Sequence, residues 1–491
     1  MSAPESPAVE SGQDSIQDGW PLLRHQRPWN GFTIFATSVS TAIATWCFII
    51  GGFVSYYLTA GQGTLAILAG SLIGILFIVL ACLPACVKYG IDSVVGSRPQ
   101  LGTRGSALSM AAIYASTLGW NVILFVFLGR ATASIMGALG VTVPSWFVGA
   151  CGVVGILVVL LMLARGPDAL RDFSRPIAVL VLILGFVILW MLIDQVGLDT
   201  LLDAPAVAPS EDPAVNWASG IEVLIASNLS WWAYTGAMVR NGPSARRSLW
   251  PVVIGLGLGV GVGSLTGFYA GLVLPDSGGD PTQFLVDIGG PAVGVLALAF
   301  IVLANIGTAV VGVYASTLAV RQLPGVSRWS WRASTLTAVL PAFVLVGFFA
   351  DQVFAEFGTF LAFLGVCFGP LCGIQIVDYF LLRRQRYDLP ALYDHSGTGT
   401  YRYWGGFNPV GFAAFAAGVA TYIYLLDPVT YVSRAPFQYT TASIPAIVVA
   451  GAVYWIGVTL VLRPLKRGGY DQAQRGGYDQ ARHAAATGGT A

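Results

Sequence analysis

Three ionisable residues lie within long apolar stretches of the chain or at the end of one: Arg130, Glu222 and Asp378. A charged group surrounded by hydrocarbon is costly to desolvate, so it is normally paired, functional or able to extend its tip to water. The positions of Arg130 and Glu222 are both explained if the tip of each side chain extends to water at the membrane boundary. Glu222 is also a candidate proton carrier. Asp378 precedes Arg383 and Arg384, which favours a structural ion pair over a proton relay.

Amides and hydroxyls form a second group of candidates. Asn121 follows Trp120 inside one apolar stretch and needs a hydrogen-bond partner, which a neighbouring helix or a bound ligand can supply. Residues 227–232 read SNLSWW, where small polar residues beside two tryptophans favour local unwinding of a helix. A third stretch carries small and polar residues that permit close helix packing: Asn305, Gly307, Thr308, Gly312 and Ser316.

The sequence offers no residues for metal chemistry or covalent catalysis within the apolar stretches. The three histidines, His25, His395 and His483, all fall in polar segments, and the six cysteines follow no metal-binding spacing. An intramembrane enzyme needs a nucleophile with a base, or a metal cluster. We therefore expect no enzymatic activity, no metal and no cofactor.

The composition indicates an integral membrane protein. Of the 491 residues, 55% are hydrophobic and 10% are charged, whereas about a quarter of the residues of a soluble domain are charged. The net charge of +1 gives no reason to expect a nucleic-acid partner. The expected surroundings are the lipid bilayer, and the expected partner is a small polar solute.

Twelve apolar runs are long enough to cross the bilayer as helices, which predicts an all-α protein with about twelve transmembrane helices. No long polar stretch separates them, so residues 29–463 are expected to form one membrane domain. Residues 1–28 and 464–491 are expected to be disordered, the latter containing a duplicated octapeptide at 467–482. The runs are 31–58, 64–87, 107–138, 145–164, 174–193, 218–239, 251–274, 290–320, 333–350, 354–382, 408–426 and 440–462.

Charged residues alternate between the connecting loops. With these twelve runs, every basic residue except Arg130 and Arg434 falls on one side, and the opposite loops are acidic. Because Lys and Arg accumulate in cytoplasmic loops, both termini are expected in the cytoplasm of a multi-pass plasma-membrane protein. The Pro-rich, acidic segment 194–217 is then an external loop between two halves of five helices each.

Three segments resemble a known family. The loop from Tyr89 to Gly105 follows the second run, and GPLCG at 369–373 and VDYFLLRR at 377–384 end the tenth. YWGGFNP at 403–409 opens the eleventh. Together they resemble the nucleobase/cation symporter family of cytosine and purine permeases and hydantoin and allantoin transporters, over a range from about Trp29 to Trp455.

The resemblance implies a leucine-transporter-like fold of two inverted five-helix repeats, followed by two extra C-terminal helices. The first and sixth helices of this fold are discontinuous near the midplane and surround the substrate with the third and eighth. Such breaks free backbone polar groups, which is tolerated in a membrane only beside a cavity. The implied function is secondary active import of a nucleobase or similar flat heterocycle by alternating access, coupled to a cation.

The resemblance also assigns candidate site residues. Trp120 takes the position of a tryptophan that stacks on the substrate, and Asn228 the position where relatives often have a second aromatic residue. Trp231 is either part of the pocket or packed in the external leaflet. The candidate substrate-binding residues are Trp120, Asn121, Ser227, Asn228, Ser230, Trp231 and Asn305, and the candidate cation-binding residues are Thr308, Thr37 and Thr41.

The coupling ion is expected to be a proton rather than sodium. Thr308 lacks the neighbouring hydroxyl residue that relatives use for sodium, since Gly307 and Ala309 flank it. A hard cation needs several oxygen ligands, which backbone carbonyls of residues 37–41 would mostly have to supply. Glu222 is the candidate proton carrier.

Departures from the family pattern keep other functions open. Ala237 and Met238 replace an acidic residue shortly before Arg240, and Leu124 stands where an amide would bind a heterocycle edge. An amino-acid or amine carrier of the same fold is therefore an alternative. A channel or a membrane sensor is a remote alternative, because neither a filter motif nor a signalling domain is evident.

Overall fold

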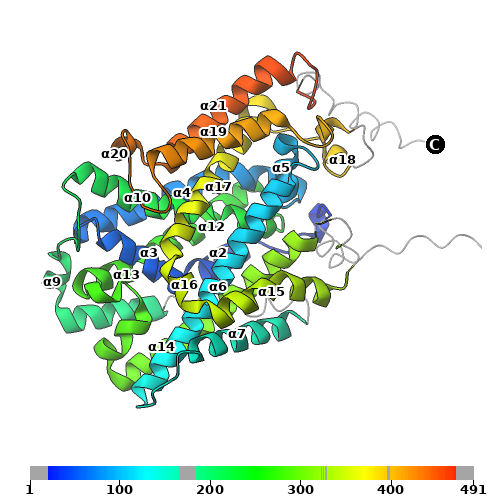
Figure 1. Ribbon diagram of the computed structural model, residues 1–491. Helices are drawn as coiled ribbons and strands as arrows, with labels where there is room; N and C mark the ends of the chain where they lie inside the picture. Colours follow the sequence, from blue (N-terminus) through cyan, green and yellow to red (C-terminus); the bar gives the residue numbers. More distant parts are fainter. Residues whose placement is uncertain are drawn as a thin grey trace, which may run out of the picture.

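The computed structural model describes residues 20–164, 183–321, 323, 326, 329–394 and 399–470. Those residues form helices without a strand, and the helices run between two opposite ends of the molecule (Figure 1). Each of the twelve predicted runs coincides with one of these helices or helix pairs. In the run 174–193, only the part from residue 183 onward is described.

The first membrane helix is broken, as the inverted-repeat fold requires. Helix α2 (Gly31–Ala42) and helix α3 (Thr45–Ser55) meet at an angle of 61°. Ile43 and Ala44 between them have extended backbones, with ψ values of 109° and 179°. The two extended residues interrupt the helical hydrogen-bond ladder and let the chain change direction.

The sixth membrane helix is interrupted more mildly than expected. Helices α10 (Pro213–Leu229) and α11 (Trp232–Val239) are joined by Ser230 and Trp231. Both residues keep helical dihedral angles, and their N–H groups bond to carbonyls three residues back. The predicted unwound segment is therefore a tightened turn rather than an extended one.

The two halves pack on each other in a reciprocal way. Helix α3 packs along helix α13 (Gly259–Val273) of the second half, and helix α10 packs along helix α4 (Ala60–Tyr89) of the first. Glycines allow the contact of α3 with α13, because a Cβ at Gly267 would lie 2.0 Å from the carbonyl oxygen of Phe48. Each broken helix thus lies against the helix that follows the other break.

The third and eighth membrane helices form the long central contact. They are α6 (Ala107–Ala138) and α14 (Pro281–Arg321), the latter kinked at Gly290. Helices α19 and α21 pack together at one side of the molecule (Figure 1). The remaining segments are α5 (Ser93–Leu101), α7 (Phe147–Leu163), 183–196, α12 (Ala245–Val252), η2 (Val253–Leu258), α15 (Trp331–Phe348), α17 (Phe357–Ile376), η5 (Val377–Leu382), α19 (Pro409–Leu425), α20 (Phe437–Thr440), α21 (Ser443–Gly457) and η7 (Val458–Leu462).

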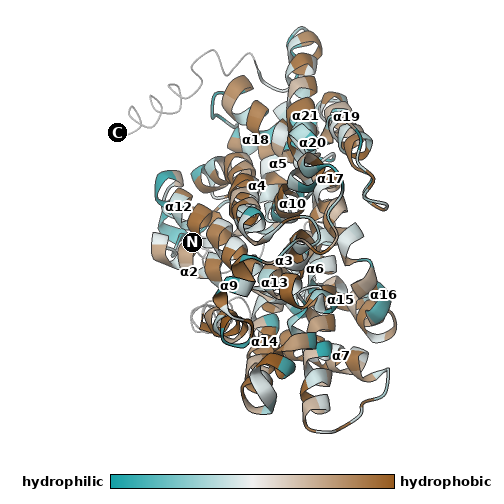
Figure 2. Ribbon diagram, turned by 90° about the vertical axis from the view of Figure 1, so that its left-hand side faces the viewer, coloured by the Kyte–Doolittle hydropathy of each residue, from teal (hydrophilic) through white to brown (hydrophobic). Residues whose placement is uncertain are grey.

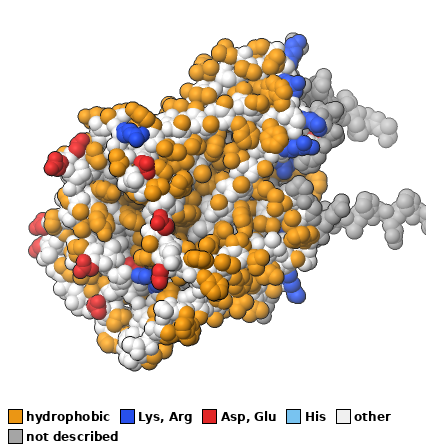
Figure 3. Space-filling view, in the orientation of Figure 1, with side chains coloured by type: hydrophobic (Ala, Val, Ile, Leu, Met, Phe, Trp, Pro, Cys, Tyr) orange, Lys and Arg blue, Asp and Glu red, His pale blue; other side chains and the backbone are white. Residues whose placement is uncertain are grey.

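The surface has the properties of a membrane protein. In the described part of the chain, seven helices are long and apolar enough to cross a bilayer, or eight if the bent pair α2 and α3 counts as one span. Large apolar side chains are exposed; Leu161 is 72% exposed and Phe348 is 80% exposed. Figure 2 shows that hydrophobic residues, in brown, are distributed along most of the helices. Acidic side chains gather at the left end of Figure 3 and basic ones at the right end. This separation agrees with the charge alternation in the sequence.

An arginine near the acidic end is paired with a carboxylate inside the protein. Arg130 of α6 forms an ion pair with Asp280 at 2.8 Å, and its guanidinium lies 4.0 Å from the ring centre of Phe354. Extension of Arg130 to water is therefore not needed, because a buried carboxylate meets its charge inside the protein.

The basic end is held by a buried ion pair, which confirms the predicted pairing of Asp378 with Arg383. Arg383 Nε lies 2.9 Å from Asp378 Oδ2. Gln100 of α5 and Tyr470 donate to the same carboxylate at 2.7 and 3.0 Å. Burial raises the pKa of Tyr470 well above its usual value, so its hydroxyl remains protonated and can donate. The pair thereby joins the loop after the second helix, the end of the tenth and the C-terminal segment.

The folded part extends beyond the expected domain boundaries of 29 and 463. Trp20 stacks on Tyr393 at 5.2 Å, and Leu22 N–H donates to the carbonyl of Gly90 at 3.0 Å. Tyr470 is buried at the other end of the chain. A few aromatic and backbone contacts are thus enough to order segments whose polar composition suggested disorder. The rest of the expected arm and tail, 1–19 and 471–491, lies outside the described residues.

Replacing Tyr470 with phenylalanine removes one hydrogen bond to the Asp378 carboxylate but keeps the ring. We expect the free energy of unfolding to fall by about 1.5–3 kcal/mol, as for other hydrogen bonds to charged groups. Thermal and denaturant unfolding of the purified protein measure it. Tyr439→Phe is the control, because Tyr439 is 79% exposed. Equal stability of Tyr470→Phe and the wild type would show that the C-terminal segment is not part of this cluster.

Candidate functional site

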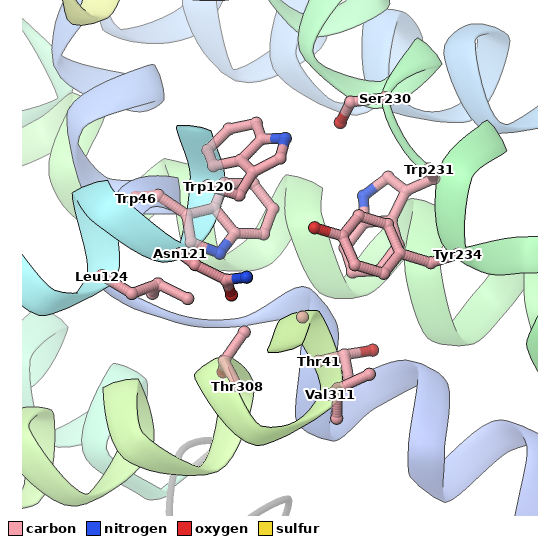
Figure 4. Close-up of a pocket in the computed structure, with 11 residues that line it drawn as sticks. Thr41, Trp46, Trp120, Asn121, Leu124, Ser230, Trp231, Tyr234, Thr308 and Val311 are labelled. Atoms are coloured by element: carbon pink, nitrogen blue, oxygen red, sulfur yellow. The ribbon is translucent and has the colours of Figure 1, made fainter. Parts of the chain in front are cut away.

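A cavity lies where the two interrupted helices meet α6 and α14. It encloses about 30 Å³, room for about two water molecules. Figure 4 shows Trp46 and Trp120 on one side of the cavity, with Trp231 and Tyr234 on the other. The lining residues are Thr41, Trp46, Trp120, Asn121, Leu124, Ser230, Trp231, Tyr234, Thr308, Val311 and Gly312.

Aromatic contacts fix the walls of the cavity. The ring of Trp46 lies 5.0 Å from that of Trp120 and 6.1 Å from that of Trp231. Behind Trp120, Phe357 and Phe360 of α17 make edge-on contacts at 5.8 and 5.3 Å. Such tilted and edge-on pairs are favourable arrangements of aromatic quadrupoles. Trp120 is therefore held in place from the side opposite the cavity.

Two polar atoms of the lining are buried without a hydrogen-bond partner among the described residues: Trp120 Nε1 and Asn121 Oδ1. The amide nitrogen of Asn121 lies 3.4 Å from Ser316 Oγ, which orients the side chain. Gly312 leaves room for it, since a Cβ there would lie 2.1 Å from Asn121 Oδ1. The cavity lining thus includes an unpaired indole N–H and an unpaired amide oxygen. An unpaired buried polar group is costly unless a ligand or water satisfies it.

Three hydroxyl groups of the lining already donate hydrogen bonds within the protein. Ser230 donates to the carbonyl of Ser227 at 2.6 Å, and Thr308 donates to that of Ala304 at 3.1 Å. Thr41 donates to the carbonyl of Thr37 at 2.9 Å. Their oxygens remain available only as acceptors. No charged side chain is found among the described lining residues.

Six of the predicted site residues line this cavity: Trp120, Asn121, Ser230, Trp231, Thr41 and Thr308. Of the two alternatives for Trp231, its place in the lining favours the pocket over packing in the external leaflet. Thr41 lies on the interrupted helix α2 and Thr308 on the central helix α14. Their role in binding a cation stays a prediction.

The other four predicted residues are outside the lining and have protein partners. Ser227 donates to the carbonyl of Leu224 at 3.1 Å, and Asn228 donates to Ser71 Oγ of α4 at 3.1 Å. Asn305 Oδ1 accepts a hydrogen bond from the Thr45 hydroxyl at 2.9 Å, at the first residue of α3. Thr37 contributes its carbonyl to Thr41. These four residues therefore bond within the protein, Asn228 and Asn305 to neighbouring helices and Ser227 and Thr37 within their own.

Trp46 and Tyr234 were not predicted from the sequence. Trp46 lies in the run WCFIIGG, where nothing distinguishes it from a membrane-packing residue. Its position one turn after the break at Ile43 and Ala44 is the signal that could have identified it. Tyr234 lies on the turn after Trp231, and their ring centres are 5.4 Å apart.

Glu222 has a different environment from the one expected. It is buried and accepts hydrogen bonds from the N–H groups of Ala442 and Ser443 at 3.0 Å and from the Ser443 hydroxyl at 2.6 Å. These donors belong to the start of α21. Three donors at a helix N-terminus hold the carboxyl group in place. Glu222 therefore joins α10 to α21, and extension to water does not describe it.

Two reciprocally packed, interrupted helices around a small enclosed cavity define the class of inverted-repeat secondary transporters. A family model described as permease for cytosine/purines, uracil, thiamine, allantoin matches residues 22–457. The chain belongs to this permease family.

Individual relatives agree with that assignment. The chain is similar to the purine-uracil permease NCS1 of Arabidopsis thaliana, with 26% identity over 84% of this chain and 73% of the relative. It is also similar to the hydantoin permease of Microbacterium maritypicum, with 23% identity over 90% of this chain and 89% of the relative. The fold matches a solved structure of Mhp1, a nucleobase-cation-symport-1 family transporter, in a closed conformation with bromovinylhydantoin bound. That match has a TM-score of 0.72 and 18% identity over 91% of this chain and 96% of the other.

A double-mutant cycle tests whether Asn305 supports the helix break. We expect Asn305→Ala and Thr45→Val each to lower the free energy of unfolding by about 1 kcal/mol, because each removes one buried hydrogen bond. The double variant should lose about 1 kcal/mol less of the free energy of unfolding than the two single variants lose together, since both changes remove the same hydrogen bond. Additive losses in denaturant unfolding would show that the two side chains are not coupled.

Proposed function

We propose that this protein is a secondary active transporter that imports an uncharged, flat nitrogen heterocycle of the nucleobase type by alternating access. The observation that carries the proposal is the aromatic cavity at the two helix interruptions. Aromatic faces bind flat rings by stacking, which is worth about 1–3 kcal/mol for each nucleic-acid base. Membership of the permease family and the substrates named for its relatives support the same class.

The polar groups of the cavity favour a neutral substrate over a charged one. The lining offers Trp120 Nε1 as donor, Asn121 Oδ1 as acceptor and the hydroxyl oxygens of Ser230 and Thr308 as further acceptors. A nucleobase-like ring carries N–H donors and carbonyl acceptors on its edge, which such groups can satisfy. An amino acid would bring an ammonium and a carboxylate into a site without a charged partner in the described lining, at a large desolvation cost. The amino-acid carrier is therefore the weaker alternative.

The small size of the cavity supports alternating access. A space of about 30 Å³ is too small for a heterocycle, so the walls must separate for the substrate to enter. The break at Ile43 and Ala44 and the tightened turn at Ser230 are the places where such movement needs few backbone changes. The charge separation in Figure 3 supports a cytoplasmic basic end, and with it the proposed plasma-membrane orientation with both termini inside.

Replacing Trp120 with alanine tests the stacking role. We expect Trp120→Ala to abolish saturable uptake of the transported heterocycle while expression stays near normal, because the lost ring is a wall of the cavity. Trp120→Phe should keep part of the uptake, since a smaller aromatic face remains. The measurement is initial uptake of radiolabelled uracil, adenine, hydantoin and allantoin in cells, normalised to protein in the membrane.

Trp146 provides a matched control for Trp120. Its side chain is 66% exposed, so Trp146→Ala should leave uptake unchanged. Undiminished uptake by Trp120→Ala would remove this residue from the substrate site.

The coupling ion in this proposal is a proton. The cavity contributes only Thr41 and Thr308 as hydroxyl ligands from α2 and α14, whereas a hard cation is usually held by several oxygens. Glu222 is no longer the favoured proton carrier, because it does not line the cavity and its carboxyl group is held by the start of α21. The small number of hydroxyl ligands on α2 and α14 therefore supports a proton.

Uptake is expected to depend on a pH gradient and to be unaffected when choline replaces sodium. Reconstituted vesicles allow the two gradients to be set separately, and initial uptake rates are the readout. Loss of uptake in sodium-free buffer at fixed pH, with recovery on adding sodium, would exclude proton coupling and restore Thr41 and Thr308 as cation ligands.

A further inference from the structure

A second, larger cavity lies near the acidic end and shares no lining residue with the central one. Its volume is about 360 Å³, which is within the range of sites for small organic molecules. The walls come from the end of α3, from α10 and α17, and from the segments around α19 and α20. Its main side chains are Phe53, Tyr57, Glu222, Tyr422, Tyr431 and Phe437.

Glu222 brings an acidic side chain to this cavity. Its three hydrogen bonds hold the carboxyl group in place, as described above. In the described part of the chain, ion pairs join Arg130 to Asp280, Arg240 to Asp92 and Arg383 to Asp378, and none involves Glu222. The carboxyl group therefore has no cationic partner among the described residues.

Tyr422 adds a second polar group beside Glu222. Its side chain is fully buried and lines the cavity, and its hydroxyl faces Glu222 with no further hydrogen-bond partner among the described residues. Tyr431 donates its own hydroxyl to the carbonyl of Gly358 and so keeps only acceptor capacity. A ligand with several N–H donors could bond to the Tyr422 oxygen and approach the carboxylate at once.

The rest of the cavity suits the apolar body of such a ligand. Phe53, Tyr57 and Phe437 supply aromatic surface, and aromatic faces attract cations through their quadrupoles. The acidic side chains that gather at this end of the molecule in Figure 3 raise the local concentration of cations. A buried carboxylate, an unpaired hydroxyl and aromatic walls therefore point to one ligand chemistry.

We propose that this outer cavity binds a small organic cation, namely a protonated primary amine attached to an aromatic body. The ammonium group meets Glu222 and Tyr422, and the ring packs against Phe53 and Phe437. The central cavity presents no charged side chain among its described lining residues, so the amine is held at the outer site and is not the transported substrate. This site does not depend on the identity of the heterocycle.

The test compares 2-phenylethylamine with 2-phenylethanol, which has the same body but no charge. Unfolding of the purified full chain is followed with a thiol-reactive dye, because Cys47, Cys82, Cys86 and Cys372 are buried and become reactive on unfolding. A ligand that binds only the folded protein must raise the melting temperature in a saturable way. We expect this for the amine and not for the alcohol.

Glu222→Gln is the main variant. A glutamine can still accept from the N–H groups of Ala442 and Ser443 and donate to the Ser443 hydroxyl, so the link to α21 is kept without the charge. We expect amine affinity to fall at least about tenfold, the loss of one charge-assisted contact. Phe53→Leu is a second variant that leaves Glu222 untouched and should also weaken amine binding.

Trp120→Ala separates the two cavities. The amine should stabilise this variant as it does the wild type, because Trp120 lines only the central cavity. Equal stabilisation by amine and alcohol, undiminished amine binding by Glu222→Gln, or loss of amine binding in Trp120→Ala would each overturn the proposal. If Glu222→Gln does not fold, unchanged amine binding by Phe53→Leu overturns it.

Discussion

Inside a membrane, every backbone N–H and C=O group needs a hydrogen-bond partner within the protein. This constraint explains why the helix interruption at Ile43 and Ala44 organises the structure around it. The carbonyl of Ala42 accepts from the Cys47 thiol at 2.8 Å, and Asn305 accepts from the Thr45 hydroxyl across the helix boundary. Side chains of α3 and α14 thus replace the missing helical bonds. The cavity beside the break is the space that remains once those groups are satisfied.

Hydrogen bonds and aromatic contacts also distinguish the residues that support the cavity from the residues that line it. Asn228 and Ser71 bond to each other and join α10 to α4, while Phe357 and Phe360 support Trp120 from behind. What remains directed at the cavity is a set of aromatic faces with a few unpaired polar atoms. A rigid supporting shell and a mainly aromatic lining suit a flat, neutral ligand, because no charge has to be compensated there.

Much of the fold could be predicted from the sequence, because run length, charge alternation and family motifs all report on the same helices. The site was predicted less completely. A polar residue in an apolar helix signals a required partner but not which one, so Asn228 and Asn305 were assigned to substrate although each bonds to a neighbouring helix through one end of its amide. Trp46 was not identified from the sequence, since its role depends on the change of direction at Ile43. The environment of Glu222 depends on α21, which lies 220 residues away in the chain.

The aromatic cavity is proposed to bind the neutral form of a flat heterocycle. The most direct measurement is the dissociation constant of a uracil derivative that loses a proton near neutral pH, determined by calorimetry across that pH range. If the cavity binds the neutral form, the affinity falls in proportion to the neutral fraction of the ligand as the pH rises, and Trp120→Ala removes the binding. Affinity that stays constant or increases as the ligand becomes an anion would contradict it.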